Sequence, residues 1–264
     1  MASVKEIYTY LDTMAPFSLQ ESFDNAGFLV GRGEARVNRI MVSLDITEEV
    51  IEEAKEADCQ LIVAHHPILF HPAKSVTDRD PVGRCLLALV ENHIAAICAH
   101  TNLDAVEGGV NDALAEKLGL SGIGQLHQEG VDPCGRPYGI GRVGTVKEYS
   151  CAEDFAAFVR ETLDARGLRL EDAGKPVRKV AVGGGACGDM LYDAVALGCD
   201  TFVTSDVKYN YFLDARALGL NLIDAGHFST ENVVCPVLVD WLQKGVPQVE
   251  VIRSLRHKEV FSCL

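Results

Sequence analysis

The chain has 264 residues, of which 48% are hydrophobic and 23% are charged, a composition typical of a globular protein with a substantial core. Its formal net charge of −14 would repel a phosphate backbone, which disfavours direct nucleic-acid binding. The sequence has no apolar run of membrane-spanning length and begins without a signal-peptide pattern. We therefore expect a cytoplasmic protein with no membrane partner.

The nine cysteines give no sign of a disulfide framework. They are scattered, odd in number and contain no C-x-x-C pair. Cys59, Cys98 and Cys199 lie in or beside apolar runs. We expect reduced thiols, in keeping with a cytoplasmic location.

The first half of the chain is predicted to alternate helices and loops with apolar strands. A helix is expected at about 3–14, followed by a loop at 22–27. Helices at 47–58 and 81–92 should connect strands, and Thr47 can cap the first of them. A further helix is predicted over 105–120.

The second half follows a similar pattern. The polar stretch 121–138 is interpreted as the connection between lobes, because it carries Gly and Pro. Ser150-x-x-Glu153 predicts a capping box that opens a helix to about Arg166. Helices are expected at 187–198 and 207–218. The tail at 248–262 is predicted to form one hairpin.

The chain repeats itself when residue 39 is placed over residue 179. The run Leu61–Ala64 then lies over Thr201–Thr204 without gaps, and the third strands align after a contraction of 13 residues. The predicted strands of the two copies are 39–42, 61–64 and 94–99, and 179–182, 201–204 and 220–226. We infer an internal duplication in which each copy supplies β-α-β-α-β.

This alternation predicts an α/β fold of two similar lobes, each with a largely parallel or mixed sheet covered by helices. Strands that are apolar throughout, such as 61–64, should be buried on both faces. Residues 1–125 are expected to form the first lobe and residues 126–264 the second. A metal-binding cleft is predicted between them.

Histidines follow three of the predicted strands, and two of these histidines have a carboxylate four residues later. The residues concerned are His65 and His66, His100 with Asp104, and His227 with Glu231. Ligands of open α/β sheets bind at the carboxyl ends of the strands. Imidazole and carboxylate together suit borderline divalent metals, so the pattern predicts one metal site.

The segments that carry these residues resemble motifs of a known family. They read SFDNAG at 22–27, HHP at 65–67, HTNLD at 100–104 and DAGHFSTE at 224–231. In this order and combination the chain resembles the Nif-three-like family, also called GTP cyclohydrolase I type 2 homologues or YbgI-like dinuclear metal proteins. The resemblance extends over about residues 4–262.

The resemblance implies a two-lobed subunit with a dinuclear metal centre, assembled as a homohexamer. His100 matches a histidine beside that centre. The positions that match the family's metal ligands are His65, His66, Asp104, His227 and Glu231. Two divalent ions, zinc, iron or manganese, would lie about 3.5–4 Å apart in such a centre.

Our leading hypothesis is a metal-dependent hydrolase that acts on a phosphorylated or nucleotide-like small molecule. His100 is the candidate general acid or base, or else a hydrogen-bond partner that orients a ligand. Lys74 and Arg79 can receive a phosphate. Asp206, which aligns with His66, can face the cleft as a substrate-binding or ligand-orienting residue, or cap a helix. The alternative function is non-catalytic metal binding, metal insertion or regulatory interaction.

Two glycine motifs receive structural interpretations. Gly183–Gly185 could cradle an anion, but no Lys-Ser/Thr follows, and a tight turn is the preferred interpretation. Gly139–Gly144 satisfies G-x-G-x-x-G. A linker precedes it and a probable strand follows, so we exclude a dinucleotide site.

Overall fold

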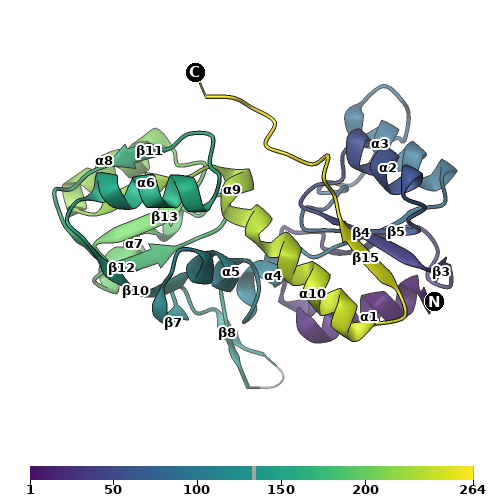
Figure 1. Cartoon of the computed structure of the whole chain (residues 1–264), viewed down its shortest axis with the longest axis horizontal. Helices are drawn as coiled ribbons and strands as arrows, with labels where there is room; N and C mark the ends of the chain where they lie inside the picture. The colour runs from purple at the N-terminus through teal and green to yellow at the C-terminus, as the bar shows by residue number, and fades with distance from the viewer. Residues whose placement is uncertain (133–134, 264) are drawn as a thin grey trace. The chain divides into compact units, whose positions relative to one another are not determined.

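The computed structural model describes residues 1–132 and 135–263 and divides the chain into two compact units (Figure 1). The first unit combines residues 1–103 with 235–258, and the second contains residues 104–234 and the tail from residue 259. The division therefore differs from the predicted boundary after residue 125. Residues 104–125 pack with the second unit, and a C-terminal helix and strand complete the first.

The first unit is built on a five-stranded sheet in the order β15-β4-β5-β6-β2. All neighbours pair in parallel except β2, which is antiparallel to β6. The strands are β2 (Gly27–Val30), β4 (Arg39–Ser43), β5 (Leu61–Ala64), β6 (Ala95–Cys98) and β15 (Glu250–Arg253). Every residue of β5 and β6 is buried, as expected for strands covered on both faces.

Helices cover both faces of this sheet (Figure 1). One face carries α2 (Glu48–Glu56) and α3 (Pro81–Glu91), and the other carries α1 (Val4–Met14) and α10 (Cys235–Gly245). The predicted first three helices are confirmed within a few residues at their ends. Among the described residues, no helix is both long and apolar enough to cross a membrane.

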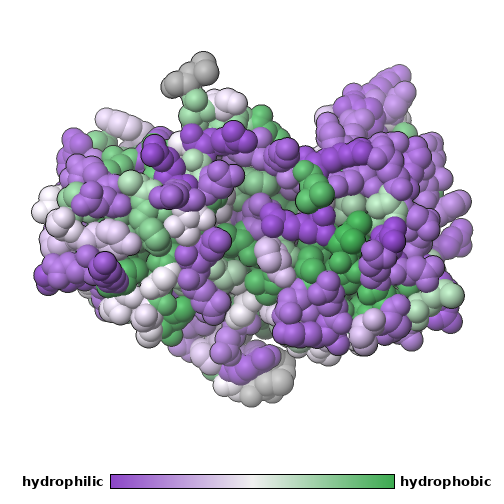
Figure 2. All heavy atoms as spheres, viewed as in Figure 1, coloured by the Kyte–Doolittle hydropathy of each residue, from purple (hydrophilic) through white to green (hydrophobic). Residues whose placement is uncertain are grey.

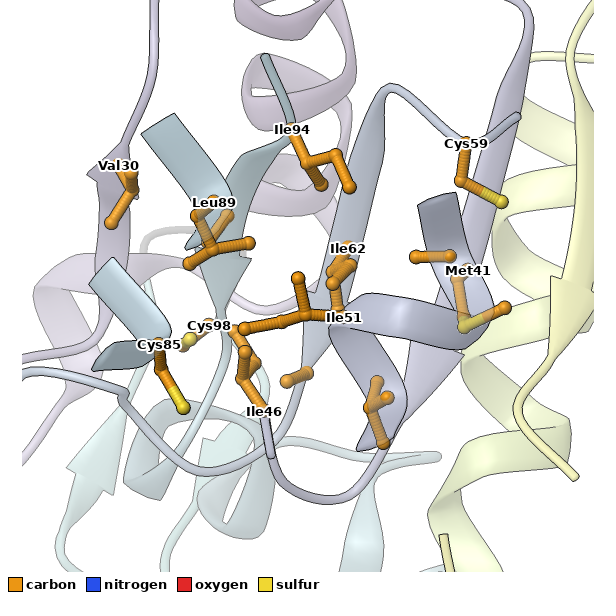
Figure 3. Close-up of a cluster of buried hydrophobic side chains, with 14 of the residues drawn as sticks. Val30, Met41, Ile46, Ile51, Cys59, Ile62, Cys85, Leu89, Ile94 and Cys98 are labelled. Atoms are coloured by element: carbon orange, nitrogen blue, oxygen red, sulfur yellow. The ribbon is translucent and has the colours of Figure 1, made fainter. Parts of the chain in front are cut away.

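The core beneath α2 and α3 shows how the pattern of apolar residues builds the first unit. Ile62 of β5 meets Ile51 of α2 and Leu89 of α3 in one buried cluster (Figure 3). Thr47 caps α2 as predicted, since its side chain accepts a hydrogen bond from the Val50 amide. The outer surface of these helices carries mainly hydrophilic side chains (Figure 2).

The second unit is built on a six-stranded mixed sheet in the order β11-β14-β13-β12-β10-β7. Its three middle strands β12, β13 and β14 are parallel, and the other three are antiparallel to their neighbours. The strands are β7 (Ser121–Gln125), β10 (Arg142–Tyr149), β11 (Arg169–Glu171), β12 (Val177–Val182), β13 (Thr201–Thr204) and β14 (Asn221–Asp224).

Helices also cover both faces of the second sheet. Val180 and Val182 of β12 pack toward α5 and α6, whereas Ala181 packs toward α7 and α8. These helices are α5 (Val110–Lys117), α6 (Ala152–Thr162), α7 (Leu191–Ala196) and α8 (Tyr209–Leu218).

Short elements complete the fold. The short strands are β1 (Ala2–Ser3), β3 (Arg36–Val37), β8 (Gly130–Val131) and β9 (Pro137–Tyr138). The short helical segments are η1 (Phe17–Leu19), α4 (Thr101–Ala105), η2 (Gly188–Met190), α9 (His227–Glu231) and η3 (Asn232–Val234).

The central strands of the two units pair in the same register. Ile40 lies opposite Leu61 in the first sheet, and Val180 lies opposite Thr201 in the second. These are equivalent positions when residue 39 is placed over residue 179. The α/β fold with parallel and mixed sheets is thus confirmed, and the matching registers are those expected of a duplication.

Four local predictions are wrong. The stretch predicted as a linker adds β7 to the second sheet, where it pairs with β10; residues 133–134 lie outside the described residues. The predicted tail hairpin is absent from the described residues, because β15 pairs in parallel with β4. The helix predicted over 105–120 is interrupted between α4 and α5, where Gly108 has a φ of +75°. Cys151 rather than Ser150 is the N-cap residue of α6, without a side-chain hydrogen bond.

Candidate metal centre

Three imidazoles meet in the first unit at the carboxyl ends of β5 and β6. His65 and His66 directly follow β5, and His100 follows β6 two residues after its end. One ring nitrogen of each lies within 4.8 Å of those of the other two. This imidazole cluster, His65, His66 and His100, can hold a metal ion.

A hydrogen-bond acceptor lies next to the Nδ1 atom of each imidazole. The pairs are His65 with the Ala99 carbonyl oxygen at 2.8 Å, His66 with Asp45 Oδ1 at 2.7 Å and His100 with Asp24 Oδ1 at 2.8 Å. Since these partners accept, the ring proton belongs on Nδ1, and Nε2 carries the lone pair that a metal ion needs. The tautomers therefore fit a metal site.

The two carboxylates in this arrangement are ionised. Burial raises the pKa of Asp24, but hydrogen bonds from His100 and Thr101 outweigh burial and hold that pKa at about 2. Burial likewise opposes ionisation of Asp45, yet hydrogen bonds from His257 and from the imidazole cluster lower the pKa of Asp45 well below its usual range. Both groups therefore act as acceptors toward the histidines.

A second group of metal-ligand type lies in the second unit. His227 opens α9 directly after Gly226, and its Nε2 lies 2.9 Å from Glu231 Oε2 at the end of that helix. A carboxylate oxygen of Asp104 in α4 lies within 4.8 Å of one of Glu231. Both carboxylates are buried. We call Asp104, His227 and Glu231 the carboxylate cluster.

Asp206 lies beside the carboxylate cluster. Its Oδ2 is 2.7 Å from His227 Nδ1. This contact repeats the arrangement of the first unit, in which an acceptor lies at Nδ1 and leaves Nε2 for a ligand role. Of the interpretations considered for Asp206, the contact favours a ligand-orienting residue.

The glycine turn after β12 fits closely around Glu231. The Gly184 amide donates to Asn111 Oδ1, and the Gly185 amide donates to Thr230 Oγ1. Both amides are thus used within the protein, which favours the tight turn over an anion cradle. Gly185 has a φ of +68°, and a Cβ atom there would lie 2.0 Å from Glu231 Oε1.

The two predicted phosphate-binding residues lie on the loop between β5 and α3. Lys74 lines a hollow of about 400 Å³ in the first unit, together with Phe70, His71 and Ser75. Arg79 belongs to the same loop but is not part of that wall. Of the two residues, Lys74 is the one that lines this hollow.

The sequence interpretation assigned no role to Asp24 or Asp45, and it treated Gly185 only as part of a tight turn. A signal was available for two of them, because Asp45 and Gly185 occupy the same position of the repeat, just after its first strand. Ligand groups of α/β sheets gather at the carboxyl ends of strands, so an acidic residue at this position in one copy was a candidate for the site. Asp24 belongs to a loop whose partner could be found only from the fold.

The fold and the two clusters define an α/β protein with two main sheets, which carries side chains of metal-ligand type after the carboxyl ends of its strands. The model of the Duf34/NIF3 (NGG1p interacting factor 3) family matches residues 2–259. The chain therefore belongs to the Duf34/NIF3 family, and the resemblance seen in its motifs is confirmed.

Relatives agree with this assignment along the whole chain. A Clostridium perfringens protein named GTP cyclohydrolase 1 type 2 homolog is 36% identical over 263 residues, which cover 98% of each chain. A Streptomyces coelicolor protein of the same name is 36% identical over 262 residues, covering 97% of this chain and 88% of the relative.

Solved structures give the same result for the fold. A Bacillus cereus protein related to NIF3 has a TM-score of 0.94 at 25% identity, with 100% of this chain and 99% of that one covered. Reduced HcgD from Methanocaldococcus jannaschii has a TM-score of 0.78 at 28% identity, with 96% and 97% covered.

Proposed function

We propose that the chain is a metal-dependent hydrolase whose imidazole and carboxylate clusters together hold one dinuclear metal centre. The proposed ligands are His65, His66, Asp104, His227 and Glu231. One observation carries the proposal: four histidines have an acceptor next to Nδ1, which leaves each Nε2 suited to a metal or a proton. His127 also has a carboxylate next to Nδ1, but the four site histidines differ from it in converging on one another or on the buried carboxylate of Glu231.

The chain itself supports treating the two clusters as parts of one site. His100 directly precedes α4, and Asp104 lies within α4. Only four positions along the chain therefore separate a member of one cluster from a proposed ligand in the other. Asp104 and Glu231 would supply the carboxylate oxygens of the proposed centre.

The donor set fits divalent zinc, iron or manganese, because it mixes imidazole nitrogen with carboxylate oxygen. Two such ions would supply Lewis-acid charge and activate water at neutral pH. His100, with Nδ1 next to Asp24, can take up a proton at Nε2 and return it to a leaving group. Asp24 would stabilise the positive imidazolium that this proton transfer creates.

We propose a phosphorylated or nucleotide-like small molecule as the substrate. Lys74 lines a hollow in the same unit as the imidazole cluster and can contact an anionic group. Relatives bear the name GTP cyclohydrolase 1 type 2 homolog, which directs attention to purine nucleotides. Hydrolysis of a phosphoester and of a purine-ring C–N bond are the two reactions to test.

The proposal is tested by measuring metal content and turnover on the same preparation. Purified protein should contain about two divalent ions per chain and should hydrolyse GTP or a member of a phosphoester panel. His100→Ala should lower kcat by about 10²- to 10⁴-fold and keep the metal. His127→Ala, which removes an exposed histidine paired with Asp193, should change neither.

Two results would contradict this assignment. Metal loss in His100→Ala would make His100 a ligand rather than the proton carrier. Full metal content without turnover of any substrate, combined with transfer of the metal to an acceptor protein, would establish a non-catalytic metal-binding or insertion protein instead.

We further propose a cytoplasmic homohexamer that makes no direct contact with nucleic acid. The support is the resemblance of the motifs to the family and the net charge of −14. Light scattering coupled to gel filtration should give about six times the subunit mass of 28.6 kDa. A single-subunit mass would contradict the hexamer and leave the metal site untouched.

A further inference from the structure

Two phenylalanine rings of the first unit are exposed next to each other. Phe23 exposes 63% of its surface and Phe70 exposes 38%. Their ring centroids are 6.4 Å apart, and the ring planes are inclined by 55°. Large apolar side chains at the surface of a folded chain are informative when they form a group beside polar residues.

The loop that carries Phe23 is held in place by the two residues that follow it, Asp24 and Asn25. Thr101 donates to the Asp24 carboxylate through its amide and its hydroxyl. The Asn25 side-chain amide donates to the Leu69 carbonyl, which lies next to Phe70 in the chain. Phe23 is therefore exposed on an anchored loop, which is the preorganisation that ligand binding requires.

Phe70 connects this aromatic pair to the imidazole cluster. Its ring centroid is 6.0 Å from that of His100, at an interplanar angle of 82°. The ring of His71 also packs against Phe70, with ring centroids 4.9 Å apart. A planar ring stacked on Phe70 would consequently lie near His100.

The hollow behind Phe70 favours a negatively charged ligand. Lys74 and Ser75 line it and present a cation and a hydroxyl. Among the described residues that line the hollow, the acidic one is Asp80. Its Oδ1 accepts a hydrogen bond from the Gly83 amide at the start of α3. One carboxylate oxygen is thereby engaged in capping the helix. Lys74 is exposed, so its ammonium can meet an anion at this hollow.

We propose that Phe23 and Phe70 form a stacking subsite for a planar heteroaromatic ring, and that Lys74 binds an anionic group of the same molecule. The inference rests on the proposed function, because the imidazole cluster would lie next to the reacting end of that molecule. Base–aromatic stacking is tolerant of the particular ring, so the subsite selects the chemical class rather than one compound.

Binding of guanosine 5′-monophosphate to the purified protein, measured by calorimetry, tests the subsite. Phe23→Ala and Phe70→Ala should each weaken binding by about tenfold, the order of magnitude for loss of one stacked base. Phe23→Trp should retain binding. Ribose 5-phosphate, which lacks the ring, should bind the parent more weakly and respond to neither alanine variant.

The matched control is Phe261→Ala, which removes an exposed phenylalanine of the second unit. It should bind the nucleotide as the parent does. Lys74→Gln should weaken binding of the nucleotide and leave binding of guanosine unchanged. Absence of nucleotide binding by the parent, or equal binding by Phe23→Ala and Phe261→Ala, would overturn the inference.

The subsite and the proposed function can fail separately. Stacking-dependent binding without any turnover would retain the subsite and remove the hydrolase assignment. Turnover of a substrate by Phe23→Ala at the parent's KM would do the opposite, because KM reports the stacking contact and kcat reports the chemistry.

Discussion

The two units place different side chains on equivalent strand ends. His65 and His66 of the first unit align with Ser205 and Asp206 of the second. The first unit thus gathers imidazoles, whereas the second brings the carboxylates of Asp104 and Glu231 together and places His227 beside Glu231. Duplication preserved the backbone frame, and the two copies diverged in the ligand chemistry that they offer.

The carboxylates that orient histidines also come from different positions of the repeat in the two units. In the first unit Asp45, at the end of β4, lies next to His66 Nδ1. In the second unit the aligned position of Asp45 is Gly185, and Asp206 lies next to His227 Nδ1 instead. A carboxylate next to Nδ1 of a histidine is thus present in both units. It follows the first strand of the repeat in one unit and the second strand in the other.

The largest expected effect is that of Gly185→Ala in the second unit. A Cβ atom there would overlap Glu231 Oε1 at 2.0 Å, so the carboxylate must leave its position. We expect this variant to lose most of the bound metal, as measured by elemental mass spectrometry. We also expect a lower free energy of unfolding.

Gly198→Ala is the matched control for this change. Gly198 has a φ of +70°, close to that of Gly185, and a Cβ atom there meets nothing within 4 Å. It should cost about 1–2 kcal/mol of stability for the left-handed backbone and keep the metal. Equal metal content in the two variants would show that the space around Glu231 is irrelevant to the site.

A smaller effect is expected when the orienting carboxylates are neutralised one unit at a time. Asp45→Asn and Asp206→Asn should each weaken metal binding by about 10- to 100-fold, because an amide holds the imidazole tautomer less well. Competition with a coloured chelator measures this affinity. Asp193→Asn, which alters the exposed pair with His127, should leave it unchanged.

Similar losses in both units would support the exchange of roles between Asp45 and Asp206. A loss for Asp45→Asn with none for Asp206→Asn would mean that the contact of Asp206 with His227 contributes nothing to metal binding. In that case Asp206 would return to the substrate-binding interpretation.

The smallest predicted effect concerns pH and belongs to the first unit. Burial opposes ionisation of Glu53, but hydrogen bonds from Ser254 and from the Leu255 and Arg256 amides lower the pKa of Glu53. Its contribution is therefore present above the unfolded pKa and is lost as pH falls through the lower folded pKa.

Glu53→Gln tests this sign. The difference in unfolding free energy between parent and variant, measured in chelator, should shrink as pH falls from about 6 to 3. A difference that stays constant over this range would show that the Glu53 charge does not hold the segment after β15.

Much of the fold followed from local patterns. Runs such as Leu61–Ala64 identify buried strands, and Thr47 identifies the start of a helix, because both signals depend on neighbouring residues. The edge strand β7 was missed and β15 was assigned to a hairpin, since the local pattern does not mark the pairing of β7 with β10 or of β15 with β4. Partner choice at a sheet edge is a tertiary property that periodicity does not encode.

The candidate site also contains residues that the sequence identified and residues that it did not. His65 and His227 were recognised because they follow strands within motifs, and the structure brings each into a cluster. Asp24 was not assigned a role, because the contact that joins it to His100 spans 76 residues. A residue that orients a side chain far away in the sequence cannot be recognised from its neighbours alone.

Metal stoichiometry in paired variants tests the central claim most directly. One protein carries His65→Ala with His66→Ala and removes ligands from the first unit. The other carries His227→Ala with Glu231→Ala and removes ligands from the second. If the clusters form one dinuclear centre, the parent should bind about two ions per chain and each double variant should bind almost none. One ion retained by each variant would show two independent sites, and full stoichiometry in either would contradict the assignment of its ligands.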